Sequence, residues 1–247
     1  MKQSFTLLAF ALLTTSVYSS ETFPEPVLAE KGDLVFESDF SKEGKVDKAE
    51  WAPRQATQWK IEDGVLRGRE STKENQAKKP HHKGLEPRVS APITPEEFVM
   101  QFSVRFAEGG VTPIVPFVEF GHHIVRARMN AKEGMSLLVD YESLKVGEAT
   151  DFKYEPGKWM HALAELKGDE FVIQFQGGPT LYAKHSVLSR PAPSGGAGFG
   201  LAGPRGGLAE IDNVKIWKAG EVQSTWEKRR ADLPKFEAVQ VREKPKK

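Results

Sequence analysis

Hydrophobic and polar residues alternate along the central part of the chain. In residues 98–106 the even positions all carry apolar side chains: Phe98, Met100, Phe102, Val104 and Phe106. Polar residues occupy most of the positions between them. Alternation with a period of two predicts a strand with one buried and one solvated face, as in an antiparallel sheet.

Further strands are predicted at the spacing expected of a β-sandwich. They cover residues 33–40, 59–67, 114–120, 122–129, 135–141, 146–154, 159–166, 170–176 and 181–185. Asp63-Gly64 divides residues 59–67 into a hairpin, because this dipeptide favours a tight primed turn. The region has no long run of apolar residues at helical spacing. We therefore predict an all-β, antiparallel two-sheet sandwich over residues 33–218.

The glycine-rich stretch 195–217 is predicted to form two strands and a loop that close the sandwich. Residues 198–203 also match the G-x-G-x-x-G pattern of dinucleotide-binding loops. That chemistry needs a helix directly after the loop, and here a strand is predicted instead. We interpret the match as a coincidence of glycine content.

The two ends of the chain differ from its centre. Residues 1–20 combine a lysine, an apolar run and small polar residues, which is typical of a secretory signal peptide cleaved near residues 17–19. Residues 21–32 are expected to be a linker. Residues 219–247 are expected to form a short helix, within 221–233, and a basic tail over 243–247. The predicted location is secreted or periplasmic, without membrane insertion once the signal is removed.

Composition narrows the chemistry. The 247 residues carry a formal net charge of +1, which gives no overall field to attract nucleic acid. The chain has no cysteine, which excludes disulfides, thiolate catalysis and cysteine-ligated metals. No zinc motif such as H-E-x-x-H is present, and no cofactor is expected. A structural calcium ion held by Asp39 and Asp212 is the alternative.

Glu210 and Asp212 resemble the clustered carboxylates of laminarinase-type glucanases. Alternation would place Glu210, Asp212 and Val214 on one side of a strand. A third carboxylate is missing farther along, since residues 213–215 are Asn, Val and Lys. A retaining glycosidase needs a nucleophile and an acid at close range, so this segment does not predict that mechanism.

The candidate ligand-binding residues are His82, His122, Arg126 and Arg128. In residues 122–129 the odd positions Val125, Ala127 and Met129 form the expected core face, which leaves His122, Ile124, Arg126 and Arg128 on the other. Imidazole and guanidinium groups on one face suit a ligand with hydroxyl or carboxylate groups. The long polar loop 70–84 would bring His82 over this face. Alternatively, these residues are surface side chains paired with Glu119, Asp140 or Glu142 on neighbouring strands.

Aromatic platforms for sugar rings are a further expectation. An indole face offers apolar area and a quadrupole to C–H groups, and at most one of four tryptophans is expected in this role: Trp51, Trp59, Trp159 or Trp217.

Several segments together resemble a known family. They are residues 34–40, the W-x-x-x-D-G-x-L hairpin at 59–66, the His82/Gly84 step, residues 98–106 and the I-D-N-V strand at 211–214. In this order they resemble the concanavalin A-like, LamG-like jelly rolls of the 3-keto-disaccharide hydrolase group of exported bacterial proteins. The resemblance implies a jelly-roll sandwich, glycan recognition and, in some members, hydrolysis of 3-keto-glycosides.

Two functional hypotheses follow. In the first, an exported jelly roll binds a carbohydrate and, if catalytic, moves protons through an imidazole, which titrates near neutral pH. In the second, the sandwich is a non-catalytic carbohydrate-binding or envelope structural module. A purely structural spacer predicts a flat face without a cleft.

Overall fold

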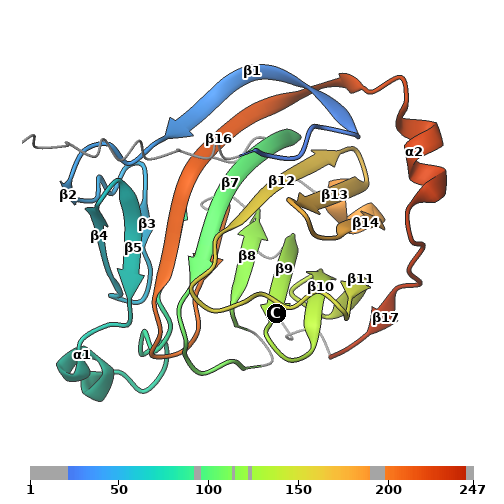
Figure 1. The fold of residues 1–247 in the computed structure, drawn as a ribbon. Coiled ribbons are helices and arrows are strands. Elements are labelled where there is room, and N and C mark those ends of the chain that lie inside the picture. Colours follow the sequence, from blue (N-terminus) through green and yellow to red (C-terminus); the bar gives the residue numbers. More distant parts are fainter. Residues whose placement is uncertain (1–21, 92–95, 113–114, 122–123, 190–197, 243–247) are drawn as a thin grey trace, which may run out of the picture.

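The computed structural model describes residues 22–91, 96–112, 115–121, 124–189 and 198–242. Within these ranges the strands build two stacked antiparallel sheets, one of nine strands and one of eight (Figure 1). This is the predicted jelly-roll sandwich. The predicted signal peptide, residues 1–20, lies outside the described ranges.

The nine-stranded sheet contains the longest strands. Its order is β14 (Thr180–Lys184), β13 (Glu170–Phe175), β12 (Met160–Lys167), β7 (Phe98–Phe106), β16 (Ala209–Val222), β5 (Val65–Arg69), β4 (Gln58–Glu62) and β2 (Gly44–Lys45), and β1 (Ala29–Ser38) also pairs with β16. The β4–β5 hairpin turns at Asp63-Gly64 with φ values of 53° and 70°, which confirms the predicted primed turn.

The eight-stranded sheet draws on segments from the whole chain. Its order is β17 (Val239–Gln240), β11 (Leu144–Ala149), β10 (Gly134–Val139), β9 (Val125–Asn130), β8 (Phe117–Phe120), β15 (Phe199–Ala202), β6 (Arg88–Ala91) and β3 (Ala52–Pro53). Strands β3, β6 and β17 were not expected, because they are short. Strand β11 begins two residues earlier than predicted and ends five residues earlier.

The core between the sheets follows the predicted alternation. In β7 all five even positions are buried in this core. The expectation of a solvated opposite face is wrong, since Val99 and Ser103 are also fully buried. Val99 belongs to a second hydrophobic cluster on the outer face of the nine-stranded sheet, together with Leu28 and Trp226.

This outer cluster is covered by both ends of the described chain. The linker expectation for residues 21–32 is wrong, because β1 starts at Ala29 and the segment before it is anchored. The backbone N–H groups of Val27, Leu28 and Ala29 donate to the buried Glu165 carboxylate, each at 2.9 Å. The predicted carboxyl-terminal helix is α2 (Trp226–Asp232), and Trp226 packs edge-on against Tyr182.

The glycine-rich stretch does contain two strands, but β15 and β16 belong to different sheets. A strand follows its loop, so the G-x-G-x-x-G match is not a dinucleotide site. Within β16 a register shift lies between Asp212 and Lys215, and Asn213 has a φ of 54°. This bulge turns Val214 into the core while Glu210 points outward, so the expected shared face for Glu210 and Val214 is wrong.

Candidate functional site

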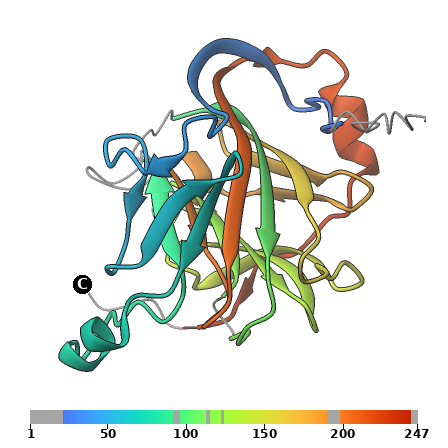
Figure 2. The same cartoon turned by 60° about the vertical axis from the view of Figure 1, so that its left-hand side comes forward.

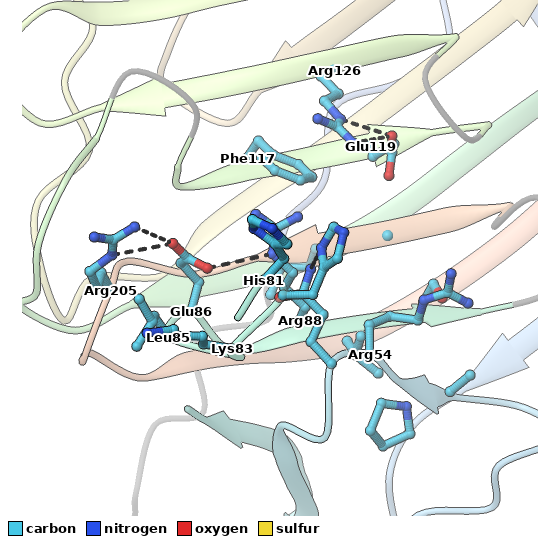
Figure 3. A pocket seen from close by; sticks show the side chains of 18 of the residues that line it. Arg54, His81, Lys83, Leu85, Glu86, Arg88, Phe117, Glu119, Arg126 and Arg205 are labelled. Carbon is cyan, nitrogen blue, oxygen red and sulfur yellow. Dashed lines mark hydrogen bonds and ion pairs between the residues drawn. The ribbon is translucent and has the colours of Figure 1, made fainter. Parts of the chain in front are cut away.

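A cavity of about 950 Å³ lies on the outer face of the eight-stranded sheet. Figure 3 shows Arg126 and Glu119 on one side of the Phe117 ring and Glu86, Arg88 and Arg205 on the other. The walls of the cavity come from the loops before β4 and β6 and from the carboxyl-terminal segment. The lining residues are Ala52, Pro53, Arg54, Gln55, Pro80, His81, His82, Lys83, Leu85, Glu86, Arg88, Val89, Ser90, Phe117, Glu119, Arg126, Glu142, Gly200, Leu201, Arg205 and Arg242.

Strand alternation builds the floor. In β8, for example, Val118 and Phe120 on either side of the lining residue Glu119 point into the core. The register of the paired strands then aligns one row of outward-facing residues across five strands. These residues are Arg126, Glu119, Gly200, Ser90 and Ala52. The last three are small, whereas Arg126 and Glu119 are large. This step in side-chain size hollows the sheet surface.

Arg126 anchors one end of the cavity. Its Nε and Nη2 atoms donate to Glu119 Oε1 at 2.8 and 2.7 Å, and Nη1 pairs with Glu142. Glu142 in turn pairs with Arg242 from the carboxyl-terminal segment. The guanidinium carbon of Arg126 lies 4.2 Å from the Phe117 ring centroid. The two carboxylates and the ring hold the guanidinium in one orientation, since charge-assisted hydrogen bonds are strong and directional.

The other end has a different balance of charge. Arg205 Nη2 donates to Glu86 Oε1 at 3.0 Å, and Arg88 Nε lies 3.8 Å from Glu86 Oε2. The buried Nε of Arg88 has no hydrogen-bond partner among the described residues. Burial lowers the pKa of Arg88, and the nearby Arg126 charge acts in the same direction. At this end of the cavity the Glu86 carboxylate is shared by the guanidinium groups of Arg205 and Arg88.

The mouth is formed by two loops tied together. Gln55 Nε2 lies 3.2 Å from His82 Nδ1, a contact that joins the two loops, and Ser71 N donates to Gly84 O at 2.7 Å, which closes the 70–84 loop on itself. Gly84 has a φ of +68°, and a Cβ atom there would lie 2.4 Å from Gln55 O. Only glycine lets the two loops approach this closely. The predicted loop 70–84 also contains a short helix, α1 (Lys73–Lys78), which projects at one end of the sandwich, away from α2 (Figure 2).

The structure brings two of the four predicted site residues together. His82 and Arg126 both line the cavity. Arg128 lies on the same face of β9 but does not line the cavity, and its Nη2 donates to Ser136 Oγ at 3.3 Å. His122 lies outside the described residues. The ion pairs expected in the alternative interpretation are also present for Arg126, which pairs with Glu119 and Glu142. Ile124 is part of the core, because it sits in the turn before β9 rather than in the strand.

Sequence reasoning missed most of the remaining lining residues. The alternation Arg88-Val89-Ser90-Ala91 was a signal for an outward Arg88, but it is too short to stand out. No tryptophan lines the described part of the cavity, and its aromatic residue is Phe117. Trp51 and Trp59 are core residues, while Trp159 and Trp217 pack against Arg105 and Lys31.

The glucanase-like carboxylates lie elsewhere. Glu210 accepts from Arg67 at 2.8 Å and from Arg105, on the outer face of the nine-stranded sheet. Asp212 Oδ1 accepts from the backbone N–H of Asn213 at 2.7 Å. Neither carboxylate lines the cavity, so they do not form a catalytic pair there.

Among the described residues, no cluster of three or more His, Asp or Glu side chains is arranged to hold a metal ion. Asp39 instead accepts a hydrogen bond from the backbone N–H of Ser41 at 3.0 Å.

Comparison with known proteins shows similarity of fold alone. No protein family model and no curated protein matches the sequence. Within the described ranges, no helix is long and apolar enough to span a membrane.

Several solved structures share the fold at low sequence identity. The GlcNAcα1-4Gal-releasing endo-β-galactosidase from Clostridium perfringens is 11% identical, with a TM-score of 0.54 over 82% of this chain and 67% of that one. SCLam, a non-specific endo-β-1,3(4)-glucanase, is 10% identical, with a TM-score of 0.50 over 79% and 98% of the two chains. Peanut lectin is 10% identical, with a TM-score of 0.50 over 78% and 100%. The chain thus has the concanavalin A-like jelly-roll fold seen in lectins and glucanases.

Proposed function

We propose that this protein is an exported glycan-binding jelly roll whose ligand occupies the cavity on the eight-stranded sheet. The observation that carries this proposal is the cavity itself, which is hollowed over Gly200 and Ser90 and bordered by fixed donors and acceptors. In this proposal residues 1–20 direct export.

The chemistry of the lining suits sugar hydroxyls. Each hydroxyl group both donates and accepts hydrogen bonds. The cavity offers guanidinium donors beside carboxylate acceptors, and Arg126 is held in place by Glu119 and Glu142. Its volume of about 950 Å³ lies in the range of small-ligand pockets. A structural spacer would not need such a cavity, which favours recognition over the envelope-module alternative.

The fold relatives support a carbohydrate ligand. By their names, the endo-β-galactosidase and the glucanase act on glycans, and peanut lectin is a lectin. Because fold alone does not determine function, this support adds to the geometry of the cavity and does not replace it.

Hydrolysis of 3-keto-glycosides is the second candidate. It is favoured by the presence of three carboxylates in the cavity. However, each of them is held by an arginine: Glu86 by Arg205, Glu119 by Arg126, and Glu142 by Arg126 and Arg242. Carboxylate oxygens that are already engaged by guanidinium groups are less available to act on a substrate. The geometry therefore favours binding over hydrolysis.

The test is a glycan array followed by calorimetry on wild type and a cavity-filling variant. Gly200→Met should reduce the affinity for the bound glycan at least tenfold, because a Cβ atom at Gly200 has room but the longer side chain fills the floor. Ala231→Met, on exposed α2, is the control and should bind like wild type. Absence of binding across the array, or equal binding by Gly200→Met, would contradict the proposal. Turnover of a 3-keto-glucoside would instead establish the hydrolase.

A further inference from the structure

The cavity carries an excess of positive charge that its own carboxylates do not balance. Its lining includes six cationic side chains, Arg54, Lys83, Arg88, Arg126, Arg205 and Arg242, but three carboxylates, Glu86, Glu119 and Glu142. The whole chain has a formal net charge of only +1. The positive charge is therefore concentrated in this cavity.

The two ends of the cavity differ in how far their cations are compensated. Glu119 and Glu142 lie at the Arg126 end, and Glu142 also pairs with Arg242. At the other end Glu86 is the single carboxylate of the lining, shared by Arg205 and Arg88. Within the described ranges, neither Arg54 nor Lys83 forms an ion pair. Arg54 and Lys83 thus lack a carboxylate partner in the described structure, and Arg88 shares Glu86 with Arg205, with its Nε 3.8 Å from Glu86 Oε2.

Arg88 is the most constrained of these cations. Its side chain is only 19% exposed, and its guanidinium carbon lies 5.4 Å from the Phe117 ring centroid. On the opposite side of that ring lies Arg126, so the two guanidinium groups repel each other across Phe117. A partly buried cation beside a second cation is stabilised when an anion binds.

The mouth strengthens the same field. Residues 73–83 contain Lys73, Lys78, Lys79 and Lys83 but one acidic residue, Glu74. Except for Lys73, which pairs with Glu70 at 2.5 Å, these lysines are exposed without an ion pair in the described structure. Lys83 lines the cavity, whereas Lys73 lines a different hollow. Cationic groups at a concave site attract anionic ligands and speed their association.

We infer that the glycan bound in this cavity carries an anionic substituent, a carboxylate or a sulfate ester, held beside Arg88 in a cavity whose lining also includes the cations Arg54 and Lys83. This inference rests on the proposed function and names its substrate class. Both groups present several negatively charged oxygens to guanidinium donors. The uncharged part of the sugar then faces the Arg126 end, where Glu119 and Glu142 would repel an anion.

The experiment compares matched charged and neutral glycans by calorimetry in low salt. One pair is an oligogalacturonate and its carboxyl-reduced form, and the other is a sulfated carrageenan oligosaccharide and its desulfated form. We expect the charged member of at least one pair to bind at least tenfold more tightly, and this advantage to shrink as NaCl screens the charges. The pair that responds identifies the anionic group.

Two variants test the location. Arg88→Gln and Arg54→Gln should each reduce the affinity advantage of the charged glycan over the neutral one at least fivefold. Arg54 is exposed, so Arg54→Gln changes a residue that the fold does not need. The matched control is Arg229→Gln on α2, which removes the same charge at the far end of the sandwich and should retain the advantage.

The outcomes separate this inference from the proposed function. Equal or tighter binding of the neutral members, or an unchanged advantage in both cavity variants, overturns the inference but leaves the glycan-binding proposal standing. Failure of every glycan, charged or neutral, to bind overturns both.

Discussion

Glu119 and Arg126 occupy directly opposed positions on β8 and β9, and the Arg126 guanidinium donates to Glu119 Oε1 through both Nε and Nη2. Both residues are less than 10% exposed. The second carboxylate, Glu142, approaches Arg126 from beyond β10. One guanidinium thus bridges two buried carboxylates at the edge of the cavity, and Arg242 also pairs with Glu142.

Removing this guanidinium should destabilise the fold. Arg126→Met leaves Glu119 and Glu142 buried without their shared cation, and breaking a buried ion pair in this way costs about 3–5 kcal/mol. Urea denaturation measures the loss in free energy of unfolding. The exposed pair Lys60–Glu62 is the comparison, and Lys60→Ala should cost less than about 1 kcal/mol. Equal effects of the two substitutions would contradict the structural role of Arg126.

Stability should depend on pH through Glu210. Burial alone would raise the pKa of Glu210, but hydrogen bonds from Arg105 and Arg67 hold it below its ordinary value of 4.5. Its contribution is therefore present above about pH 4.5 and is lost as pH falls through the depressed pKa. Glu210→Gln should be less stable than wild type near neutral pH, and the gap in free energy of unfolding should narrow as the pH falls below 4.5. A gap that stays constant in denaturation curves across this range would refute the assignment.

Glu165 should hold the amino-terminal segment against the nine-stranded sheet. Glu165→Ala leaves the backbone N–H groups of Val27, Leu28 and Ala29 without their acceptor, and an unsatisfied buried donor costs about 1–3 kcal/mol. Hydrogen exchange should show faster exchange at Leu28 and Ala29. Glu30→Ala, at a neighbouring exposed position, should leave both amides protected. Unchanged protection in Glu165→Ala would show that β1 pairing alone holds the segment.

The mouth of the cavity should depend on Gly84. Gly84→Ala adds a Cβ atom that would lie 2.4 Å from Gln55 O, so the loop carrying His81 and His82 must shift. We expect lower stability and weaker glycan binding. Gly177→Ala is a matched control, because Gly177 also has a positive φ, 64°, but has no atom within 4 Å of the added Cβ. It should cost about 1–2 kcal/mol of backbone strain and leave binding intact. Calorimetry and thermal unfolding of both variants test the difference.

The sequence by itself determined the local geometry of the sandwich. Period-two alternation located β7 and the core-facing residues Val125, Ala127 and Met129, because side chains of a strand alternate between faces whatever its partners are. Asp63-Gly64 determined a hairpin turn, because its two left-handed residues are a local requirement. Trp226 likewise marked a helix with one apolar side.

The cavity was decided by tertiary structure. Arg88 lies far from Glu119 and Arg126 along the chain, and only the pairing of β6, β15, β8 and β9 places the three residues over one hollow. Arg242 reaches Glu142 only because β17 pairs with β11. Local irregularities in the strands account for the side chains that face the other way than expected. The bulge at Asn213 reverses the face of Val214, and the turn before β9 places Ile124 in the core. Alternation says which residues share a face of a strand, but strand order and register decide which strands bring their faces together.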